Sequence, residues 1–479
     1  MRIATFEVFL LIILCACLSC NKGGTQQETT VGKVNSIQKR MNKTDALLSP
    51  PSWAKDATLY EVNLRQYTEE GTFKSFIPQI PRLKDMGIDI LWFMPIYPIS
   101  KEKRKGELGS YYAVQDYTAV NEEFGSLVEF REMVAAIHRA GMKIIIDFVP
   151  NHTGWDHAWI TEHPEFFTKN SQGEITEPLD PNNGNSKGWS DVAELDYTNF
   201  QMRQALTDEM VWWLTDCDVD GFRMDIAYEV PNDFWDECIP TLMRTKKVFL
   251  LAEAEAPHLR NISGFAADYG WKLYHLMNGI AEGTKNTYDI AKWYQSDRSE
   301  YHRGYHINFT SNHDENSWSG TEFERLGEGS ESFAVLAGTL DGMPLIYSGQ
   351  EEPLMRRLKF FEKDFIGFRN FKNADFYRTL LNLKKKNKAL YNGDFGGEAK
   401  FLETSNDKVI AYSRASQGDL IFVLINLSSS QQFIEMSTAD IEGPFENVFG
   451  NSTTRLGPTS KFNLKPWDYL VLSRVGNEK

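Results

Sequence analysis

Cysteine is scarce in this chain of 479 residues and is unevenly placed. Three of the five cysteines lie within the first 20 residues, so only Cys217 and Cys238 remain for the rest. Two cysteines do not make the disulfide framework of a small secreted protein, and we expect both to be buried free thiols. A Gly-rich phosphate loop is also missing after the first predicted strand, which disfavours a dinucleotide-binding fold.

Positive charge is in deficit as well. The chain has 51 Lys and Arg against 66 Asp and Glu, which gives a formal net charge of −15. This balance argues against nucleic acid as a partner and against binding to an anionic membrane surface. Hydrophobic residues make up 42% of the chain, an ordinary share for a soluble globular protein, and the length allows a large core and more than one domain.

Residues 1–20 have the layout of an export signal. Arg2 precedes the apolar run VFLLIILCACLSC, which is too short to span a bilayer comfortably and gives way to a polar segment. The crowded cysteines resemble a bacterial lipoprotein signal, in which a Cys becomes the lipidated first residue of the mature chain. Cys20, at the apolar-to-polar boundary, is the expected lipidation site; Cys17 is the alternative, and so is a plain cleaved signal. The resemblance implies an exported chain, lipid-anchored to a bacterial membrane at the periplasmic face or the cell surface, with no other membrane contact.

The rest of the chain divides into three parts. Residues 21–52 are polar and aperiodic, and we expect a flexible tether. Residues 53–387 alternate apolar strand-like runs with amphipathic helical segments, which predicts an α/β fold, a closed (β/α)8 TIM barrel; an open doubly wound sheet is the alternative. Within them, the Gly-, Asn- and Pro-rich stretch 151–198 is a predicted insertion after the third strand. Short strands separated by turns over residues 388–479 predict a C-terminal antiparallel β domain.

Charged side chains gather where the predicted strands end, which is where the chemistry of such barrels lies. Arg223 and Asp225 are two residues apart on one strand, so their side chains point to the same side. Three further strands carry similar residues near their ends: Asp147, Asn151 and His152 on the third; Glu253 and Glu255 on the fifth; Asn312, His313 and Asp314 on the seventh. One buried ion pair is common in a core, but four such placements at one end favour an active site.

These residue types favour glycoside hydrolysis. Paired carboxylates allow one to attack the anomeric carbon and a second to protonate the leaving oxygen. Arg223 is expected to lower the pKa of Asp225 and keep it ionised. The set contains no nucleophilic Ser or Cys, and His152 and His313 do not have the helical spacing of a zinc site.

Four stretches resemble, in the same order, the main motifs of the α-amylase family of glycoside hydrolases: DFVPNH (147–152), GFRMD (221–225), LLAEA (250–254) and SNHD (311–314). The segments YYAVQDY (111–117) and GMPLIYSGQE (342–351) are similar to the family too. The resemblance implies a retaining hydrolase that cleaves α-1,4-glucosidic bonds in starch, maltodextrins or related α-glucans through a covalent glycosyl-enzyme. It also implies an α-glucan polysaccharide or oligosaccharide as partner, and no cofactor for the chemistry.

The same resemblance assigns roles to single residues. Asp225 matches the nucleophile, Glu253 the general acid/base, and Asp314 the third carboxylate, which grips sugar hydroxyls. The expected substrate-binding residues are Tyr112, His152, Arg223 and His313. Glu255 faces the same way as Glu253 on a strand, and it would be the acid if the register of that strand slipped by two residues.

The chain departs from the family pattern at Tyr228 and Glu229, where many α-amylases carry Lys-His. This segment is more similar to neopullulanases and cyclomaltodextrinases, so such an enzyme or a transglycosylating relative is an alternative. Asn151 matches a calcium ligand of the family, and Asp196 or Asp191 would add a carboxylate, which allows a structural Ca²⁺. A non-catalytic α-glucan-binding lipoprotein on the same fold is a further alternative, which the presence of all three carboxylates disfavours.

Overall fold

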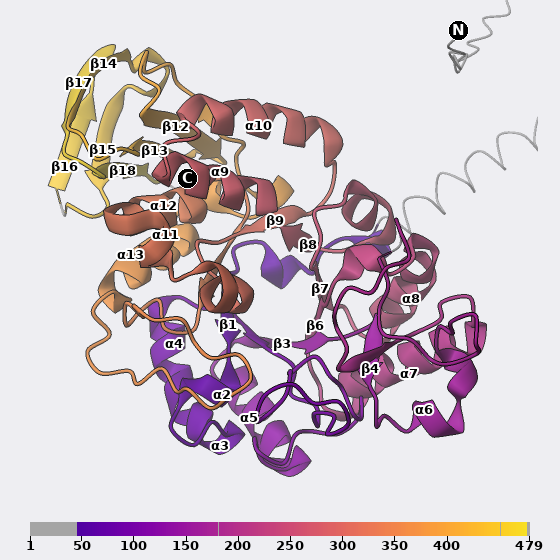
Figure 1. The fold of residues 1–479 in the computed structure, drawn as a ribbon. Helices are drawn as coiled ribbons and strands as arrows, with labels where there is room; N and C mark the ends of the chain where they lie inside the picture. Colours follow the sequence, from indigo (N-terminus) through magenta and orange to yellow (C-terminus); the bar gives the residue numbers. More distant parts are fainter. Residues whose placement is uncertain (1–45, 181, 451, 477–479) are drawn as a thin grey trace, which may run out of the picture. The chain divides into compact units, whose positions relative to one another are not determined.

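Eight parallel strands close into a barrel in the order β1-β10-β9-β8-β7-β6-β3-β2 (Figure 1). This computed structural model describes residues 46–180, 182–450 and 452–476. The barrel strands are β1 Leu59–Val62, β2 Ile90–Phe93, β3 Lys143–Phe148, β6 Gly221–Met224, β7 Phe249–Ala252, β8 Ala267–Tyr269, β9 Tyr305–Asn308 and β10 Met343–Tyr347. All eight lie within residues 53–387, so the barrel prediction is confirmed. The predicted signal peptide and most of the tether lie outside the described residues.

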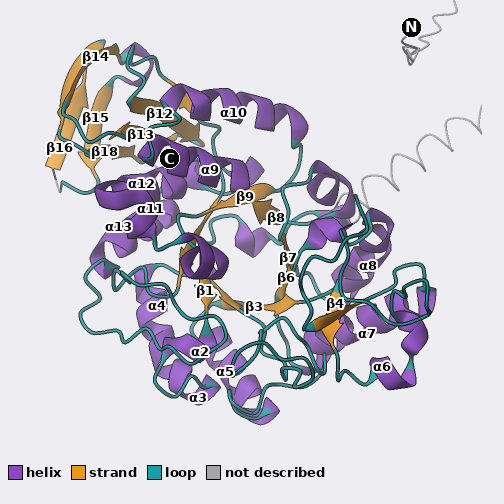
Figure 2. Ribbon diagram, in the orientation of Figure 1, coloured by secondary structure: helices purple, strands orange, loops and turns teal. Residues whose placement is uncertain are grey.

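Helices surround the barrel strands (Figure 2). They are α2 Leu64–Tyr67, α3 Phe73–Phe76, α4 Ile80–Met86, α5 Leu127–Arg139, α6 Trp159–Glu162, α7 Phe200–Asp216, α8 Asn232–Thr245, α9 Trp271–Ala281, α10 Thr287–Glu300, α11 Glu322–Leu326, α12 Ser330–Thr339 and α13 Ala374–Lys386. Local sequence sets several helix starts: Ser126 and Glu129 form a capping box at α5, and the side chain of Asn199 caps α7. In the described part of the chain no helix is long and apolar enough to cross a membrane.

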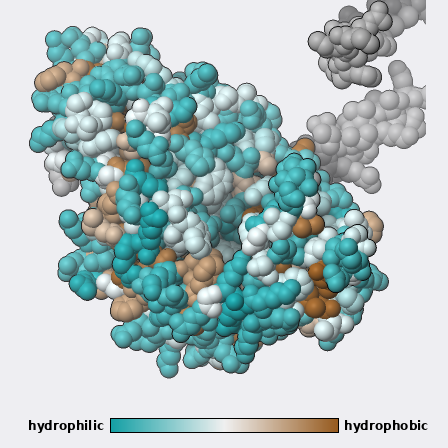
Figure 3. All heavy atoms as spheres, viewed as in Figure 1, coloured by the Kyte–Doolittle hydropathy of each residue, from teal (hydrophilic) through white to brown (hydrophobic). Residues whose placement is uncertain are grey.

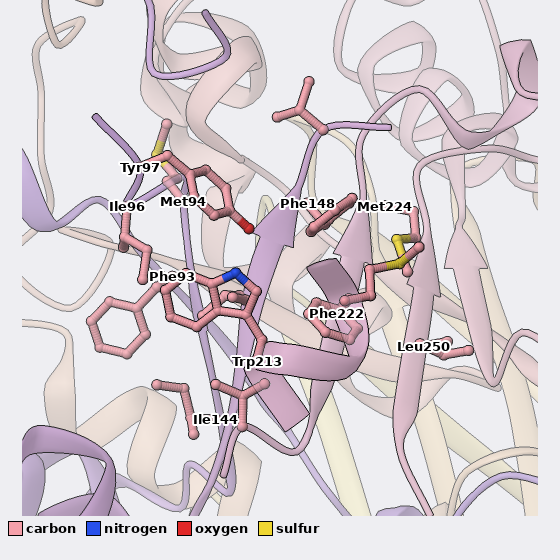
Figure 4. Packing of buried hydrophobic residues seen from close by; sticks show 14 of the residues in the cluster. Phe93, Met94, Ile96, Tyr97, Ile144, Phe148, Trp213, Phe222, Met224 and Leu250 are labelled. Carbon is pink, nitrogen blue, oxygen red and sulfur yellow. The ribbon is translucent and has the colours of Figure 1, made fainter. Parts of the chain in front are cut away.

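An apolar layer between strands and helices fixes the orientation of β6. Phe222 and Met224 point outward into this layer, which also contains Phe148 of β3 and Trp213 of α7 (Figure 4). Burying each such side chain contributes about 1.5–3 kcal/mol. Because side chains alternate along a strand, Arg223 between these two residues points into the barrel. Packing outside the barrel therefore aims a cation at its interior.

The predicted insertion after the third strand is built around a small antiparallel sheet. Its strands are β4 His152–Gly154 and β5 Val192–Glu194, with His152 opposite Glu194. Tyr197 donates a hydrogen bond to the carbonyl of Pro150 at 2.7 Å, which ties the end of the insertion back to the third strand. The insertion is thus anchored at the edge of the barrel mouth.

The C-terminal part is antiparallel, as predicted. A six-stranded sheet has the order β11-β12-β13-β18-β15-β16, and β14 pairs with β17. The strands are β11 Lys400–Phe401, β12 Val409–Ser416, β13 Asp419–Asn426, β14 Gln432–Ser437, β15 Gly443–Asn447, β16 Ser452–Leu456, β17 Thr459–Leu464 and β18 Tyr469–Arg474. This sheet shares a core with α12, where Leu336 of the helix and Leu340, just after it, lie in one cluster with Tyr412. Cys217 and Cys238 are buried and free, which confirms that expectation.

Candidate active site

Three neighbouring strands place the central charges. Arg223 on β6 is in register with Asp147 on β3 and with Leu251 on β7. The strands β6 and β7 end at Met224 and Ala252, so Asp225 and Glu253 are the first residues beyond them. The expectation that the fifth strand extends through Glu253 to Glu255 is therefore wrong, because the chain leaves the barrel wall at Glu253.

Arg223 is the centre of the site. Its side chain is fully buried and contacts three carboxylates: its Nη1 lies 2.9 Å from Asp147 and 2.8 Å from Asp225, and its Nη2 lies 2.9 Å from Glu253. The nitrogen Nε donates to the hydroxyl of Tyr269 at 3.2 Å. A planar guanidinium suits this arrangement because its donors point in fixed directions to several acceptors.

One cation does not neutralise three buried carboxylates. Burial raises the pKa of Asp147 to about 7 although Arg223 opposes the shift. Burial also raises the pKa of Asp225 well above its usual range; Arg223 lowers it, and Glu253 and Asp147 raise it further. The expectation that Arg223 keeps the pKa of Asp225 low is not met, because burial and two like charges outweigh one ion pair. Asp147 and Asp225 share the guanidinium of Arg223, so the protonation of one affects the pKa of the other.

A second charged group lies around His313. Its ring nitrogen Nδ1 contacts the carboxylate of Glu61, and Nε2 lies 3.2 Å from Asp314 and 2.8 Å from the hydroxyl of Tyr112. Burial alone would lower the pKa of His313, but Asp314 and Glu61 raise it well above its usual range. The resulting imidazolium lowers the pKa of Asp314 against the effect of burial. Asp314 is therefore held as a carboxylate.

Glu61 is a site residue that the sequence analysis missed. It is fully buried on β1, with burial raising the pKa of its carboxyl. The signal was a carboxylate as the one charged side chain in the strand Leu59–Val62. Glu61 contacts His313, which follows β9, two strands away in the barrel, so it supports the site through His313.

These residues surround a cavity of about 360 Å³, which is within the usual range for small-ligand pockets. Its lining residues are Lys105, Ser110, Tyr112, His152, Trp189, Asp191, Val192, Asp225, Ile226, Glu253, Asp314, Trp318, Phe360 and Phe361. Five of the predicted catalytic and substrate-binding residues are among them, and so is Asp191, a predicted calcium ligand. Arg223 and His313 are not; they contact the lining carboxylates instead. The surrounding face is mostly hydrophilic, and apolar residues form small separate groups on it (Figure 3).

The walls of the cavity are aromatic. On one side Phe360 stacks on Tyr112 with ring centroids 6.4 Å apart, and Trp318 lies against Phe360 at 5.4 Å. On the other side Trp189 lies 6.0 Å from His152, whose pKa burial lowers to about 3, so this ring is neutral. Flat apolar rings suit the faces of sugar rings. Trp189 and Phe360 come from loops, and Trp318 comes from the helical turn η6 Glu315–Ser319; none of the three lies in a sequence motif.

The backbone between the two central carboxylates is strained. Ile226 has φ 36° and ψ 45°, a left-handed conformation that a β-branched residue rarely adopts. Such a residue costs on the order of 1–3 kcal/mol and persists only where surrounding contacts hold it. Here the amide of Ile226 donates to Glu253 at 2.6 Å. The strained turn thereby fixes Glu253 against the residue that follows Asp225.

Glu255, the alternative acid, is not part of the cavity lining. Its carboxylate accepts a hydrogen bond from the amide of Lys272 at 3.1 Å and lies close to Asp297 and His306. The geometry therefore favours Glu253 over Glu255 as the acid of this site.

The side chains expected to bind calcium are engaged elsewhere. Asp191 forms an ion pair with Lys105 at 2.9 Å. Asp196 accepts hydrogen bonds from the amide and hydroxyl of Thr198 at 2.9 and 2.7 Å, and the side-chain oxygen of Asn151 lies 3.1 Å from His152. The ammonium group of Lys105 thus already balances the charge of Asp191. The side-chain oxygens of Asn151, Asp191 and Asp196 contact these partners and do not form a cation site in this arrangement. Calcium binding at these residues stays a prediction.

Comparison with known proteins places the barrel in a family. The family described as "Alpha amylase, catalytic domain" matches residues 55–389. An alpha-amylase from Haloarcula japonica is 23% identical over 404 residues, which cover 79% of this chain and 56% of that protein. An alpha-1,4-glucan:maltose-1-phosphate maltosyltransferase from Picrophilus torridus is 27% identical over 459 residues, covering 87% of this chain and 69% of that protein. The chain thus spans 56% and 69% of the length of these two relatives.

Solved structures agree on the fold. A maltogenic alpha-amylase from Thermotoga neapolitana is 26% identical, with a TM-score of 0.78, and the match covers 88% of this chain and 99% of that one. An alpha-amylase from Geobacillus thermoleovorans, solved in complex with acarbose, is 20% identical with a TM-score of 0.75, covering 89% of this chain and 99% of that one.

Proposed function

This chain belongs to the alpha-amylase catalytic-domain family, and from that premise we propose that it is a retaining glycoside hydrolase acting on α-1,4-linked glucans such as maltodextrins and starch. One observation carries the proposal: Asp225, Glu253 and Asp314 line a single aromatic-walled cavity above the buried Arg223. A binding protein does not need Asp225 and Glu253 held with Asp147 around one buried cation at the expense of their desolvation.

In this proposal Asp225 and Glu253 perform the two steps. The carboxylate of Asp225 attacks the anomeric carbon while Glu253 gives its proton to the leaving glycosidic oxygen, which forms a covalent glycosyl-enzyme. Glu253, now a carboxylate, then takes a proton from water, and the hydroxide attacks the same carbon and releases Asp225. The anomeric configuration is inverted twice and so retained.

The charges support this division of roles. The reaction needs Asp225 ionised and Glu253 protonated, and the ion pair with Arg223 favours the ionised form of Asp225 against the effect of burial. Asp314 is kept as a carboxylate by His313, and its side chain is 37% exposed toward the cavity, so it can accept hydrogen bonds from two sugar hydroxyls. Tyr112 offers its ring to the sugar face, a contact worth on the order of 1 kcal/mol.

A transglycosylating enzyme is the second candidate. It would use the same glycosyl-enzyme but would transfer the sugar to another sugar in place of water. Two observations favour it: one relative is named a maltosyltransferase, and Tyr228, three residues after Asp225, is 59% exposed. An exposed aromatic ring close to the nucleophile suits a sugar acceptor.

Product analysis separates these candidates. The enzyme is incubated with maltoheptaose, pullulan and cyclodextrin, with and without glucose as an added acceptor. Hydrolysis predicts shorter maltodextrins only, and transfer predicts products longer than the substrate. Proton NMR of the first product should show the α-anomer; an initial β-anomer would refute the retaining mechanism.

We also propose that the chain is exported and anchored through a lipid on Cys20. The support is the sequence of residues 1–20, which lies outside the described residues. Cys20→Ala should move the protein from the membrane fraction to the soluble fraction of the producing bacterium. If Cys20→Ala stays in the membrane fraction and Cys17→Ala does not, the anchor is Cys17. If neither variant is released, the anchor proposal fails.

A further inference from the structure

A second group of ligand-type side chains lies outside the active-site cavity. Glu255 follows β7, Asp297 is in α10 and His306 is on β9, and each offers an atom within 4.8 Å of the others. Among the residues that the structure describes, no other group of three or more His, Cys, Asp or Glu side chains has this geometry. Asp297 and His306 are buried, while Glu255 is half-buried and leaves the group open on one side.

The imidazole of His306 is oriented as in a metal site. Its Nδ1 lies 2.7 Å from Oδ1 of Asp268, the residue opposite it on β8. The other nitrogen, Nε2, lies 3.1 Å from both carboxylate oxygens of Asp297 and 3.1 Å from Nη1 of Arg260. A carboxylate that holds one ring nitrogen and frees the other toward a cation is the usual support of a metal-bound histidine.

The charges around this group favour a dication. Glu255, Asp268 and Asp297 place three acidic side chains here, and the basic groups beside them are Arg260, 3.0 Å from Asp268, and Lys272, whose charge acts on Glu255. A doubly charged ion that replaced the proton on His306 would add one positive charge among the three acidic side chains. Buried charges are stable only where they are paired or bind a metal.

Two buried polar atoms beside the group have no partner. One is the second carboxylate oxygen of Asp268, and the other is the hydroxyl of Tyr301. Tyr301 is 5% exposed, its ring lies 4.9 Å from that of His306, and its hydroxyl is close enough to the three carboxylates for their charges to raise its pKa. Such orphaned atoms are expected to be satisfied by a water or an ion.

We infer that Glu255, Asp297 and His306 form a binding site for a zinc-type divalent cation, with Asp268 orienting His306. A nitrogen ligand selects Zn²⁺ or a similar transition metal over Ca²⁺, which prefers oxygen. Three protein ligands leave a fourth position for water, next to the hydroxyl of Tyr301. The ion would connect the loop that carries Glu253 to α10. This inference does not depend on the proposed function.

The test measures the metal itself. Untagged full-length protein is stripped with a chelator, desalted, and titrated with ZnCl₂ by calorimetry, while Co²⁺ loading is followed by visible absorption. The wild type should bind one Zn²⁺ per chain, and Co²⁺ should give the absorption of a four-coordinate site with nitrogen and oxygen ligands. CaCl₂ at the same concentration should not compete.

Two variants locate the ion. Glu255→Gln, at a half-buried position, and Asp297→Asn, nearly isosteric, should each weaken Zn²⁺ binding at least tenfold, which is about 1.4 kcal/mol. Glu300→Gln, at an exposed position at the end of α10, is the matched control and should bind as the wild type does. The absence of stoichiometric Zn²⁺ binding to folded wild type would overturn the inference and leave an ion-pair network. Unchanged binding in both variants would overturn it too.

Discussion

Nη1 of Arg223 lies 2.8 Å from Oδ1 of Asp225, two residues along the chain, and both residues are buried. The same guanidinium reaches Asp147 and Glu253. We predict that Arg223→Lys lowers kcat by at least about 100-fold, because a lysine ammonium does not hold three carboxylates in the fixed directions of a guanidinium. Steady-state kinetics and circular dichroism measure this. Arg378→Lys, in an exposed ion pair with Asp85, is the control and should change kcat less than twofold. A similar kcat in both variants would contradict the role of Arg223.

The second prediction separates Glu253 from Glu255. Glu253→Gln should abolish turnover of maltodextrins, whose leaving oxygen needs a proton, and should spare glycosyl-enzyme formation from an α-glucosyl fluoride, which leaves without one. Glu255→Gln should keep maltodextrin turnover within a few-fold of wild type. Loss of maltodextrin hydrolysis in Glu255→Gln alone would assign the acid to Glu255.

The third prediction concerns pH. Asp225 must be ionised to attack, and its pKa is raised, so activity should fall as pH falls through this raised value. The acidic limb of kcat/KM should therefore lie well above the ordinary pKa of Asp, which is about 3.9. Asp147→Asn removes a neighbouring negative charge that raises this pKa and should move the limb to lower pH by about one unit or more. Asp218→Asn, at an exposed position away from the site, should leave it in place. An unmoved limb in Asp147→Asn would show that the carboxylates do not titrate together.

The fourth prediction concerns the aromatic wall. Phe360 stacks on Tyr112 and contacts Trp318, so Phe360→Ala should raise KM for maltodextrins about fivefold to tenfold with a smaller change in kcat, which corresponds to about 1 kcal/mol of stacking. Phe433→Ala, on β14 and 71% exposed, is the control and should leave KM unchanged. A kcat loss without a KM change would mean that Phe360 positions the carboxylates and does not bind sugar.

The barrel, and the polar residues at the ends of its strands, can be predicted from the sequence because both follow from local periodicity. Apolar runs alternating with amphipathic segments define the eight strands, and alternation within a strand puts Arg223 and Asp225 on one side. Periodicity does not show at which residue each strand ends. The fifth strand ends at Ala252, so Glu255 leaves the path that a longer strand would have taken.

Contacts between distant segments could not be predicted in the same way. Glu61 supports His313 across 252 positions in sequence, and Phe360 reaches Tyr112 from the loop after β10. The raised pKa of Asp225 is also a collective property, because it depends on how many carboxylates share Arg223 and how deeply they are buried. A single sequence motif gives the residue types, but it does not give the combined effect of burial and neighbouring charges on a pKa.

The central claim, that Asp225 forms a covalent bond to sugar while Glu253 handles the proton, is tested most directly by mass spectrometry. Glu253→Gln enzyme is mixed with α-maltosyl fluoride, quenched in acid and digested, and the peptides are mapped. Because the variant can form the glycosyl-enzyme but lacks the base that activates water, the adduct should accumulate on the peptide that contains Asp225. Folded Glu253→Gln enzyme that forms no adduct, or forms one on another residue, would contradict the account.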